Sequence, residues 1–192
     1  VELARVALWL EGFAEGMPLS FLDHHLKVGN SLLGIFDLQV LKKGIASEAF
    51  KNAGHDDKSV CSALNKSNNE EVRSLKKLRD DTALMRDFFR SSQENQMLLA
   101  LEQMHSVRLE DEKSKAKAYC QYLKIVEKSH VKAACDLFVG AYMSPKTVCF
   151  DNKVPTSGTV YRVLIQDDGA ADREKIPYAT SVCRDNAVFH WP

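Results

Sequence analysis

The spacing of hydrophobic residues predicts a mainly α-helical chain. A first helix is predicted over residues 1–11, because four apolar residues recur there at the i, i+3, i+4, i+7 spacing that gathers side chains on one helical face: Leu3, Val6, Ala7 and Leu10. Gly12 and Gly16 follow this segment and are expected to end the helix. We therefore expect an amphipathic helix packed on a core.

The region from Glu70 to Met143 predicts the longest helices. It contains no proline, its one glycine is Gly140, and apolar residues return at helical intervals in three stripes, over residues 72–89, 98–107 and 116–142. Ser144-Pro145 is expected to end the last stripe, because proline disfavours helix in the residue before it. Long helices joined by short polar breaks predict an antiparallel helical hairpin or a small bundle.

The remaining segments predict less regular structure. Leu19–Leu22 is a short apolar run that favours a strand, and Asp37 to about Asn69 is polar enough to predict a loop, with a helical turn near Ser47–Phe50. Residues 146–192 contain prolines, glycines and the acidic run QDDGAADRE, which predict an irregular α/β segment. Within it, Val160–Ile165 fits either a short strand or the start of a helix. The chain thus divides into residues 1–36, 37–145 and 146–192.

Composition narrows the class of protein. Of 192 residues, 45% are hydrophobic, and Lys+Arg and Asp+Glu number 26 each, so net charge does not draw the chain to nucleic acid or to an anionic membrane. The five cysteines form no Cys-x-x-Cys pair, and we expect reduced, buried thiols. No apolar run is long enough to span a bilayer, which predicts a soluble, cytoplasmic protein without membrane partners. A start at Val1 without a helix-capping residue, and an end on an aromatic cluster, favour an internal segment of a longer protein.

Asp23, His24 and His25 invite a metal site or a general base, because imidazole and carboxylate bind metals and move protons near neutral pH. On a strand, successive side chains point to opposite faces, so the two histidines could not reach one ion. A loop in which one histidine bonds to the backbone is the favoured interpretation. The other four histidines are far apart in the sequence and predict solvent or core positions: His55, His105, His130 and His190.

Gly29-Asn30-Ser31-Leu32 is a stronger candidate for ligand binding. Glycine permits close approach of a ligand, and open α/β sheets place ligand contacts on short polar side chains at the carboxyl ends of strands. The alternative is a plain turn in which asparagine tolerates a left-handed backbone. The residues alone favour the plain turn.

Four segments of the sequence resemble those of one enzyme family. VELARVALWLE at residues 1–11, PLSFLDHHLKVGNSLLG at 18–34, HVKAACDLFVGAYM at 130–143 and FHWP at 189–192 resemble, in order, segments of the large, type IIG-like adenine-specific DNA methyltransferases of restriction-modification and phage-defence systems. These segments cover 46 of the 192 residues, about a quarter of the chain. The resemblance implies that residues 1–36 are the edge of an α/β, Rossmann-like methyltransferase core, that residues 37–145 are a helical insertion, and that residues 146–192 lead back to the core.

The resemblance also implies a cofactor, S-adenosyl-L-methionine. Asn30 stands where related enzymes often carry an aspartate that accepts a hydrogen bond from the cofactor's adenine, with Gly29, Ser31 and Leu32 flanking the ring. The family's glycine-rich cofactor loop and its catalytic Asn-Pro-Pro-aromatic motif, which holds a flipped adenine, do not occur in residues 1–192. We therefore expect a parent enzyme that methylates duplex DNA, and no activity in this segment alone.

The helical region carries basic runs at Arg73–Arg79 and Lys113–Lys117. They could line a DNA phosphate track, but acidic residues are interspersed, and a solvated helix face is the favoured interpretation. A non-catalytic module that binds protein or DNA is the alternative function. Apolar surface that the rest of a methyltransferase core would cover predicts self-association of the segment.

Overall fold

The structure, a computed structural model, describes residues 2–11, 26, 28–30, 32–80, 114, 117–118, 120–121, 124–125, 129–167 and 169–190. The chain forms two compact units. One comprises Val1–Gly29 and Phe89–Ser129, and the other comprises Asn30–Phe88 and His130–Pro192. We describe each unit by itself.

In the first unit, helix α1 spans Glu2–Glu11, which confirms the helix predicted from the first apolar spacing. Its apolar face is not covered as expected, because Leu3 is 87% exposed and Leu10 is 63% exposed. The strand expected at Leu19–Leu22, the pair His24-His25 and the helical stripe over residues 98–107 lie outside the described residues. Isolated described positions between residues 114 and 125 are helical, as the third stripe predicts.

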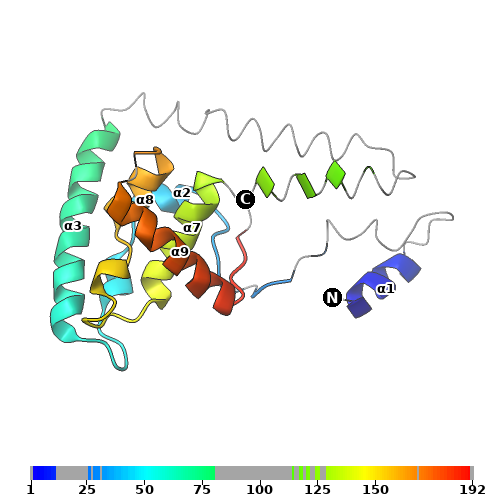
Figure 1. The fold of residues 1–192 in the computed structure, drawn as a ribbon, viewed down its shortest axis with the longest axis horizontal. Helices are drawn as coiled ribbons and strands as arrows, with labels where there is room; N and C mark the ends of the chain where they lie inside the picture. The colour runs from blue at the N-terminus through cyan, green and yellow to red at the C-terminus, as the bar shows by residue number, and fades with distance from the viewer. Residues whose placement is uncertain are drawn as a thin grey trace. The chain divides into compact units, whose positions relative to one another are not determined.

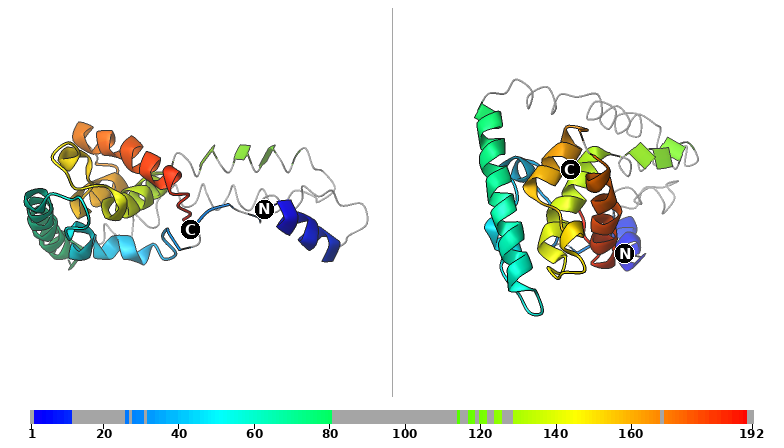
Figure 2. Two further views of the ribbon diagram at one scale, coloured as in Figure 1. Left: turned by 90° about the horizontal axis from the view of Figure 1, so that it is seen from below. Right: turned by 60° about the vertical axis from the view of Figure 1, so that its left-hand side comes forward.

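The second unit is built around α7, which spans His130–Met143 (Figure 1). Helices α8 (Ser157–Leu164) and α9 (Ala170–Asp185) pack on α7, and α3 (Lys58–Asp80) packs on α8. Figure 2 shows the same order from another side, with α3 along the outer side of the unit and α8 between α3 and α9. Three short helical segments complete the unit: α2 (Gln39–Lys43), η2 (Ser47–Phe50) and η3 (Asp151–Lys153).

The sequence of α7 explains its central position. Nine of its fourteen residues are buried, Val131 and Ala134–Ala141, so it is apolar around most of its circumference. The small residues permit close packing, since a Cβ on Gly140 would meet the Ala179 Cβ at 3.0 Å. The helix ends at Met143, directly before Ser144-Pro145, as expected. The third apolar stripe is nevertheless not one helix, because the buried Ser129 is non-helical and α7 begins after it.

The loop expected from Asp37 to Asn69 is wrong at Gln39–Lys43, where α2 lies, and throughout its second half. The helical turn at Ser47–Phe50 is confirmed, but α3 already begins at Lys58. Val60, Cys61, Leu64 and Asn68 lie on its inner side at helical spacing. The polar run NKSNNEE, which suggested a loop, supplies the exposed side of this helix and one buried amide.

The irregular α/β segment expected over residues 146–192 is also wrong, because the structure has the helices α8 and α9 there. Val160–Ile165, which fitted either a strand or a helix start, falls in α8 and its C-cap. Pro177 lies exposed in the middle of α9, where it removes one backbone hydrogen bond. Packing of α9 on α7 stabilises the helix despite that loss.

Helices α8 and α9 end in the same way. Gln166 and Ala187 follow their C-caps in left-handed conformation, with φ of 58° and 50°. In α9, the Ala187 N–H donates to the Arg184 carbonyl at 3.0 Å and the Val188 N–H donates to the Cys183 carbonyl at 2.8 Å. This is the Schellman pattern, in which glycine usually occupies the left-handed position. At the end of α9, the motif turns the chain directly toward residues 188–190.

A closed polar network joins α3 to the start of α8. The Nδ2 of Asn68 donates to the Ile45 carbonyl at 2.8 Å, and its Oδ1 accepts from the N–H and the hydroxyl of Ser157 at 2.9 and 2.7 Å. The Ser157 hydroxyl oxygen in turn accepts from the Ile45 N–H at 2.8 Å. Glu71 accepts from the Gly158 N–H at 2.8 Å. Side chains of α3 therefore satisfy the N-terminal donors of α8, whose own N-cap residue makes no side-chain capping bond.

These observations confirm a mainly α-helical chain. Among the residues that the structure describes, β structure is limited to one parallel bridge between Asn30 and Val188. No helix in the described part of the chain is both long and apolar enough to cross a membrane. All five cysteines are free, but the expectation that they are buried holds for Cys61, Cys135 and Cys183 and is wrong for Cys120 and Cys149, which are exposed.

Candidate functional site

The first and last described segments of the second unit lie side by side. The Asn30 N–H donates to the Ala187 carbonyl at 2.6 Å, and the Phe189 N–H donates to the Leu33 carbonyl at 3.3 Å. The described residues of 30–34, the entering segment, and residues 187–190, the leaving segment, therefore run parallel and side by side, where the blue chain meets the red end in Figure 1. We call this pair of segments the junction.

Two of the four predicted cofactor residues, Asn30 and Leu32, are described in the junction, and Gly29 directly precedes it. Gly29 and Asn30 are exposed, Leu32 is 88% exposed, and Ser31 lies outside the described residues. The Asn30 Oδ1 accepts a hydrogen bond from the Leu32 N–H at 3.0 Å, which is the asparagine turn that the sequence offered as the plain alternative. An amide oxygen has two lone pairs, so the turn leaves one of them for a ligand. The geometry thus fits both interpretations.

Gly34 is required at the junction for two reasons. Its φ of +133° is rare for other residues, and a Cβ there would lie 1.8 Å from the Phe189 carbonyl oxygen. The two segments consequently approach as closely as backbones can. The glycine that closes the motif PLSFLDHHLKVGNSLLG therefore has a definite structural role in the contact with FHWP.

His190 fastens the junction to the helices. Its Nδ1 accepts a hydrogen bond from the Ile35 N–H at 3.2 Å, and its Nε2 lies 3.0 Å from the Asp136 Oδ1. Because Nδ1 faces a donor, the neutral ring carries its proton on Nε2 and donates it to the carboxylate. The His190 side chain is 8% exposed and that of Asp136 is 4% exposed, so both bonds are shielded from water.

Asp136 is the one acidic residue of α7, and every described partner of its carboxylate donates to it. Its Oδ2 accepts from the Lys132 ammonium at 2.9 Å and from the Thr180 hydroxyl at 2.9 Å. Burial by itself raises the pKa of Asp136, but the hydrogen bonds from His190 and Lys132 outweigh it and hold that pKa below its ordinary value. The carboxylate is therefore ionised at neutral pH.

Cys183 completes a group that resembles a metal site. Its sulfur, a carboxylate oxygen of Asp136 and a ring nitrogen of His190 lie within 4.8 Å of one another. The sulfur, however, lies 3.4 Å from the Asp136 backbone carbonyl, and burial raises the pKa of this thiol to about 12. A metal on Nε2 would move the ring proton to Nδ1, where it would oppose the Ile35 N–H. The three residues form a hydrogen-bonded cluster better than they form a metal centre.

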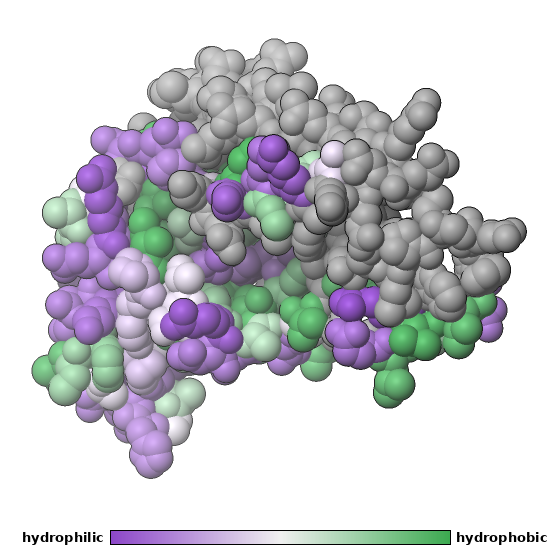
Figure 3. Space-filling view, turned by 45° about the vertical axis from the view of Figure 1, so that its right-hand side comes forward, coloured by the Kyte–Doolittle hydropathy of each residue, from purple (hydrophilic) through white to green (hydrophobic). Residues whose placement is uncertain are grey.

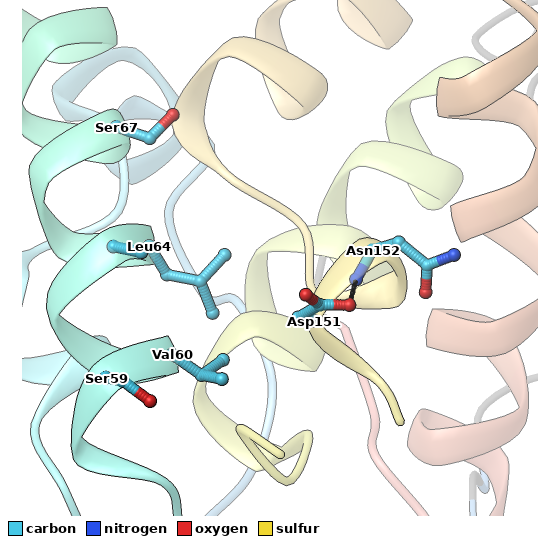
Figure 4. Close-up of a pocket in the computed structure, with 7 residues that line it drawn as sticks. Ser59, Val60, Leu64, Ser67, Asp151 and Asn152 are labelled. Atoms are coloured by element: carbon cyan, nitrogen blue, oxygen red, sulfur yellow. Dashed lines mark hydrogen bonds between the residues drawn. The ribbon is translucent and has the colours of Figure 1, made fainter. Parts of the chain in front are cut away.

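A separate groove lies between α3 and η3 (Figure 4). It has a volume of about 460 Å³, with Val60 and Leu64 on its floor. Asp151 is its one titratable lining residue, and its carboxylate accepts from the neighbouring Asn152 N–H at 2.6 Å. This groove offers space but no pair of groups suited to acid–base or nucleophilic chemistry.

The other predicted candidates are not brought together. His55 is exposed, His130 is half-buried at the start of α7, and His105 lies outside the described residues, as do Asp23, His24 and His25. Arg73 and Lys76 of the first basic run are exposed on α3, as a solvated helix face predicts. Most of the second run, Lys113–Lys117, is outside the described residues.

No protein-family model, curated protein or solved structure matches the chain. The assignment of function therefore rests on the residues and on the geometry of the junction.

The network of Asp136 and His190 was not among the predicted site residues. Its members are 54 positions apart, and no local spacing links them. The available signal was the isolated aspartate in the otherwise apolar run AACDLFVGAYM, because a buried carboxylate requires partners. The sequence does not indicate which residue supplies them.

Proposed function

We propose that this chain is an internal region of an S-adenosylmethionine-dependent DNA adenine methyltransferase of a restriction-modification or phage-defence system. In this proposal Gly29, Asn30, Ser31 and Leu32 form one wall of the cofactor pocket. Residues 37–145 form a mainly helical insertion into a Rossmann-like core, and residues 146–192 lead back to that core. The observation that carries the proposal is the junction, because two phrases that resemble core segments of that family, ending at Gly34 and starting at Phe189, are hydrogen-bonded neighbours.

The geometry of the turn supports a role in binding adenine. Asn30 is exposed, and the second lone pair of its Oδ1 can accept a hydrogen bond from the adenine amino group. Leu32 is exposed beside it and offers an apolar surface for the ring. An asparagine provides no charge assistance, so this bond is weaker than one to aspartate.

The proposal assigns no catalysis to residues 1–192 alone. In the family that the sequence resembles, an Asn-Pro-Pro-aromatic motif positions the flipped adenine for methyl transfer, and a glycine-rich loop holds the cofactor. Neither motif occurs in this sequence. The segment contributes a binding wall and a helical unit, and the reacting groups belong to the rest of the enzyme.

The reading frame that encodes the chain gives the first test. A glycine-rich loop encoded upstream and an Asn-Pro-Pro-aromatic motif encoded downstream support the proposal, and a frame with neither removes it. The second test measures transfer of labelled methyl groups to adenine in duplex DNA by the protein of that complete frame. Asn30→Ala is expected to weaken cofactor binding about tenfold, Asn30→Asp to retain it, and the exposed Asn69→Ala to leave it unchanged. Equal cofactor affinity in Asn30→Ala and Asn69→Ala would refute the role of the turn.

A second candidate is an interaction module without catalysis, and exposed apolar side chains favour it. Hydrophobic side chains reach the surface among hydrophilic ones (Figure 3), and several are more than half exposed: Leu3, Leu10, Val28, Leu32 and Phe36. Such side chains suit contact with the remainder of a core or with a second copy. Sedimentation equilibrium of the chain with Leu3→Lys and Leu10→Lys tests this candidate. Self-association that these substitutions abolish supports it, and a monomeric wild-type chain at all concentrations opposes self-association.

A further inference from the structure

One short segment, residues 187–190, holds the turn at Asn30 through backbone hydrogen bonds. The Ala187 carbonyl accepts a hydrogen bond from the Asn30 N–H, and the Phe189 N–H donates to the Leu33 carbonyl. That segment leaves α9 through a Schellman motif in which Ala187 has a φ of 50°, an unfavourable conformation for alanine. A residue persists in such a conformation only where surrounding contacts determine it. The two Schellman hydrogen bonds help to hold this conformation, and the contacts of residue 190 add to them.

His190 makes those contacts on both of its ring nitrogens. One bond, from the Ile35 N–H to Nδ1, reaches the entering segment just after the turn. The other, from Nε2 to the Asp136 Oδ1, reaches the centre of α7. The imidazole thus bridges the entering segment and the helical core, while its own backbone belongs to the leaving segment.

Asp136 is a rigid anchor for this bridge. Lys132 from its own helix and Thr180 from α9 donate to Oδ2 at 2.9 Å each, so the carboxylate cannot rotate without losing two bonds. Oδ1 is left to His190. Since α7 and α9 make the most extensive contact between described helices, the position of the imidazole follows the helical core.

We propose that His190 is a positioning residue, which transmits the packing of α7 and α9 through Asp136 to the Asn30 turn. The relevance of this role to cofactor binding rests on the proposed function of the turn. The coupling itself is a property of the junction and holds in the absence of cofactor. As a consequence, Asn30 presents its Oδ1 in a single orientation as long as the Asp136–His190 bond is intact.

The ¹⁵N-labelled chain tests the proposal without any substitution that affects folding. Long-range ¹⁵N–¹H spectra of the wild type are expected to show a neutral His190 with its proton on Nε2. A proton on Nδ1, or a doubly protonated ring at neutral pH, would overturn the bridge.

Amide hydrogen exchange in variants of the chain tests whether His190 couples Asp136 to the Asn30 turn. In His190→Ala, protection of the Asn30 and Ile35 amides is expected to fall about tenfold, which corresponds to loss of one shielded hydrogen bond. The Ile45 amide, which donates to Ser157 elsewhere in the unit, serves as the internal reference and is expected to stay within about twofold. The exposed His55→Ala is the matched control and is expected to change none of the three amides.

His190→Gln distinguishes positioning from general stabilisation. A glutamine amide can place a donor near the position of Nε2 and restore the bond to Asp136, but it leaves the Ile35 N–H without the Nδ1 acceptor. Protection is therefore expected to recover at Asn30 and to stay low at Ile35. An unchanged Asn30 amide in His190→Ala, or an equal loss at Asn30, Ile35 and Ile45, would refute the positioning role. Because exchange is measured without cofactor, absence of methylation by the complete protein would refute the proposed function and leave this result intact.

Discussion

Removal of the Asn68 side chain is predicted to destabilise the helical unit strongly. Asn68→Ala eliminates the three hydrogen bonds that its amide makes to the Ile45 carbonyl and to the N–H and hydroxyl of Ser157. The Ser157 hydroxyl can rotate and still bonds the Ile45 N–H, but the Ile45 carbonyl and the Ser157 N–H lose their partners in a region where Asn68 itself is 0% exposed. Each buried, unsatisfied group costs about 1–3 kcal/mol, so we expect a loss of about 3–5 kcal/mol. The free energy of unfolding of a typical domain is about 5–15 kcal/mol, so this loss is a large fraction of it.

Urea unfolding, followed by circular dichroism, measures this loss, and the neighbouring residue supplies a matched control. Asn69 is exposed and its amide bonds only Asn65 on the same helix, so Asn69→Ala is expected to change the free energy of unfolding by at most about 0.5 kcal/mol. The double variant with Ser157→Ala is expected to be less destabilised than the sum of the single variants, because they remove shared bonds. A difference between Asn68→Ala and Asn69→Ala below about 1 kcal/mol would show that water satisfies the exposed groups, and it would refute the reasoning.

Four further predictions follow from the geometry. Gly34→Ala is expected to open the junction. Gly54 also has a positive φ, but nothing lies within 4 Å of a Cβ there, so Gly54→Ala should destabilise the unit only by the backbone strain of about 1 kcal/mol. Thermal unfolding compares the stabilities of the two variants. Ala187→Gly is expected to stabilise the unit by up to about 1 kcal/mol in the same assay, because glycine relieves the left-handed strain. Asp136 has a lowered pKa, so its stabilisation is fully present above the ordinary pKa near 3.8 and is lost as pH falls through the folded value; unfolding of Asp136→Asn should depend less on pH in that acidic range. A thiol reagent is expected to modify the exposed Cys120 and Cys149 rapidly in the native protein. It should modify the buried Cys61, Cys135 and Cys183 only after unfolding, and mass spectrometry of the products identifies the modified residues.

Each of these predictions has a contrary outcome. Equal destabilisation by the two glycine substitutions would deny the close approach at Gly34. A destabilised Ala187→Gly variant would mean that the Schellman turn carries no strain. Unchanged pH dependence in Asp136→Asn would mean that the carboxylate is not preferentially ionised in the folded state, and rapid modification of Cys135 or Cys183 would contradict their burial.

Helix type was predictable from sequence where apolar spacing was uninterrupted, and helix boundaries where proline stood. The helices α1 and α7 have strong spacing, and Pro145 marks the end of α7. The start of α3 was not predictable, because its inner side is partly polar and its stability comes from the network of Asn68 with distant residues. Helix α9 was obscured by Pro177, whose local cost is outweighed by packing on α7.

The candidate site divides in the same way. The asparagine turn at Asn30 is local, and its hydrogen bond to the Leu32 N–H follows from side-chain chemistry two residues apart. The contact of that turn with residues 187–190 is not local, because nothing in either segment specifies its partner. The bond between Asp136 and His190 likewise depends on the fold of the whole unit. The sequence indicated the chemistry of the Asn30 turn, and tertiary structure determines that this turn meets residues 187–190 and that Asp136 meets His190.

The adjacency of Asn30 and Val188 has a consequence for how such a chain evolves. Because residues 30 and 188 lie side by side, insertions or deletions in exposed loops of the chain between them need not change the register of their pairing. The entropic cost of closing a loop grows only slowly with its length, so a large excursion is nearly as easy to accommodate as a short one. The chain between the two segments can therefore differ in length while the backbone pairing, which needs a glycine at position 34, stays the same.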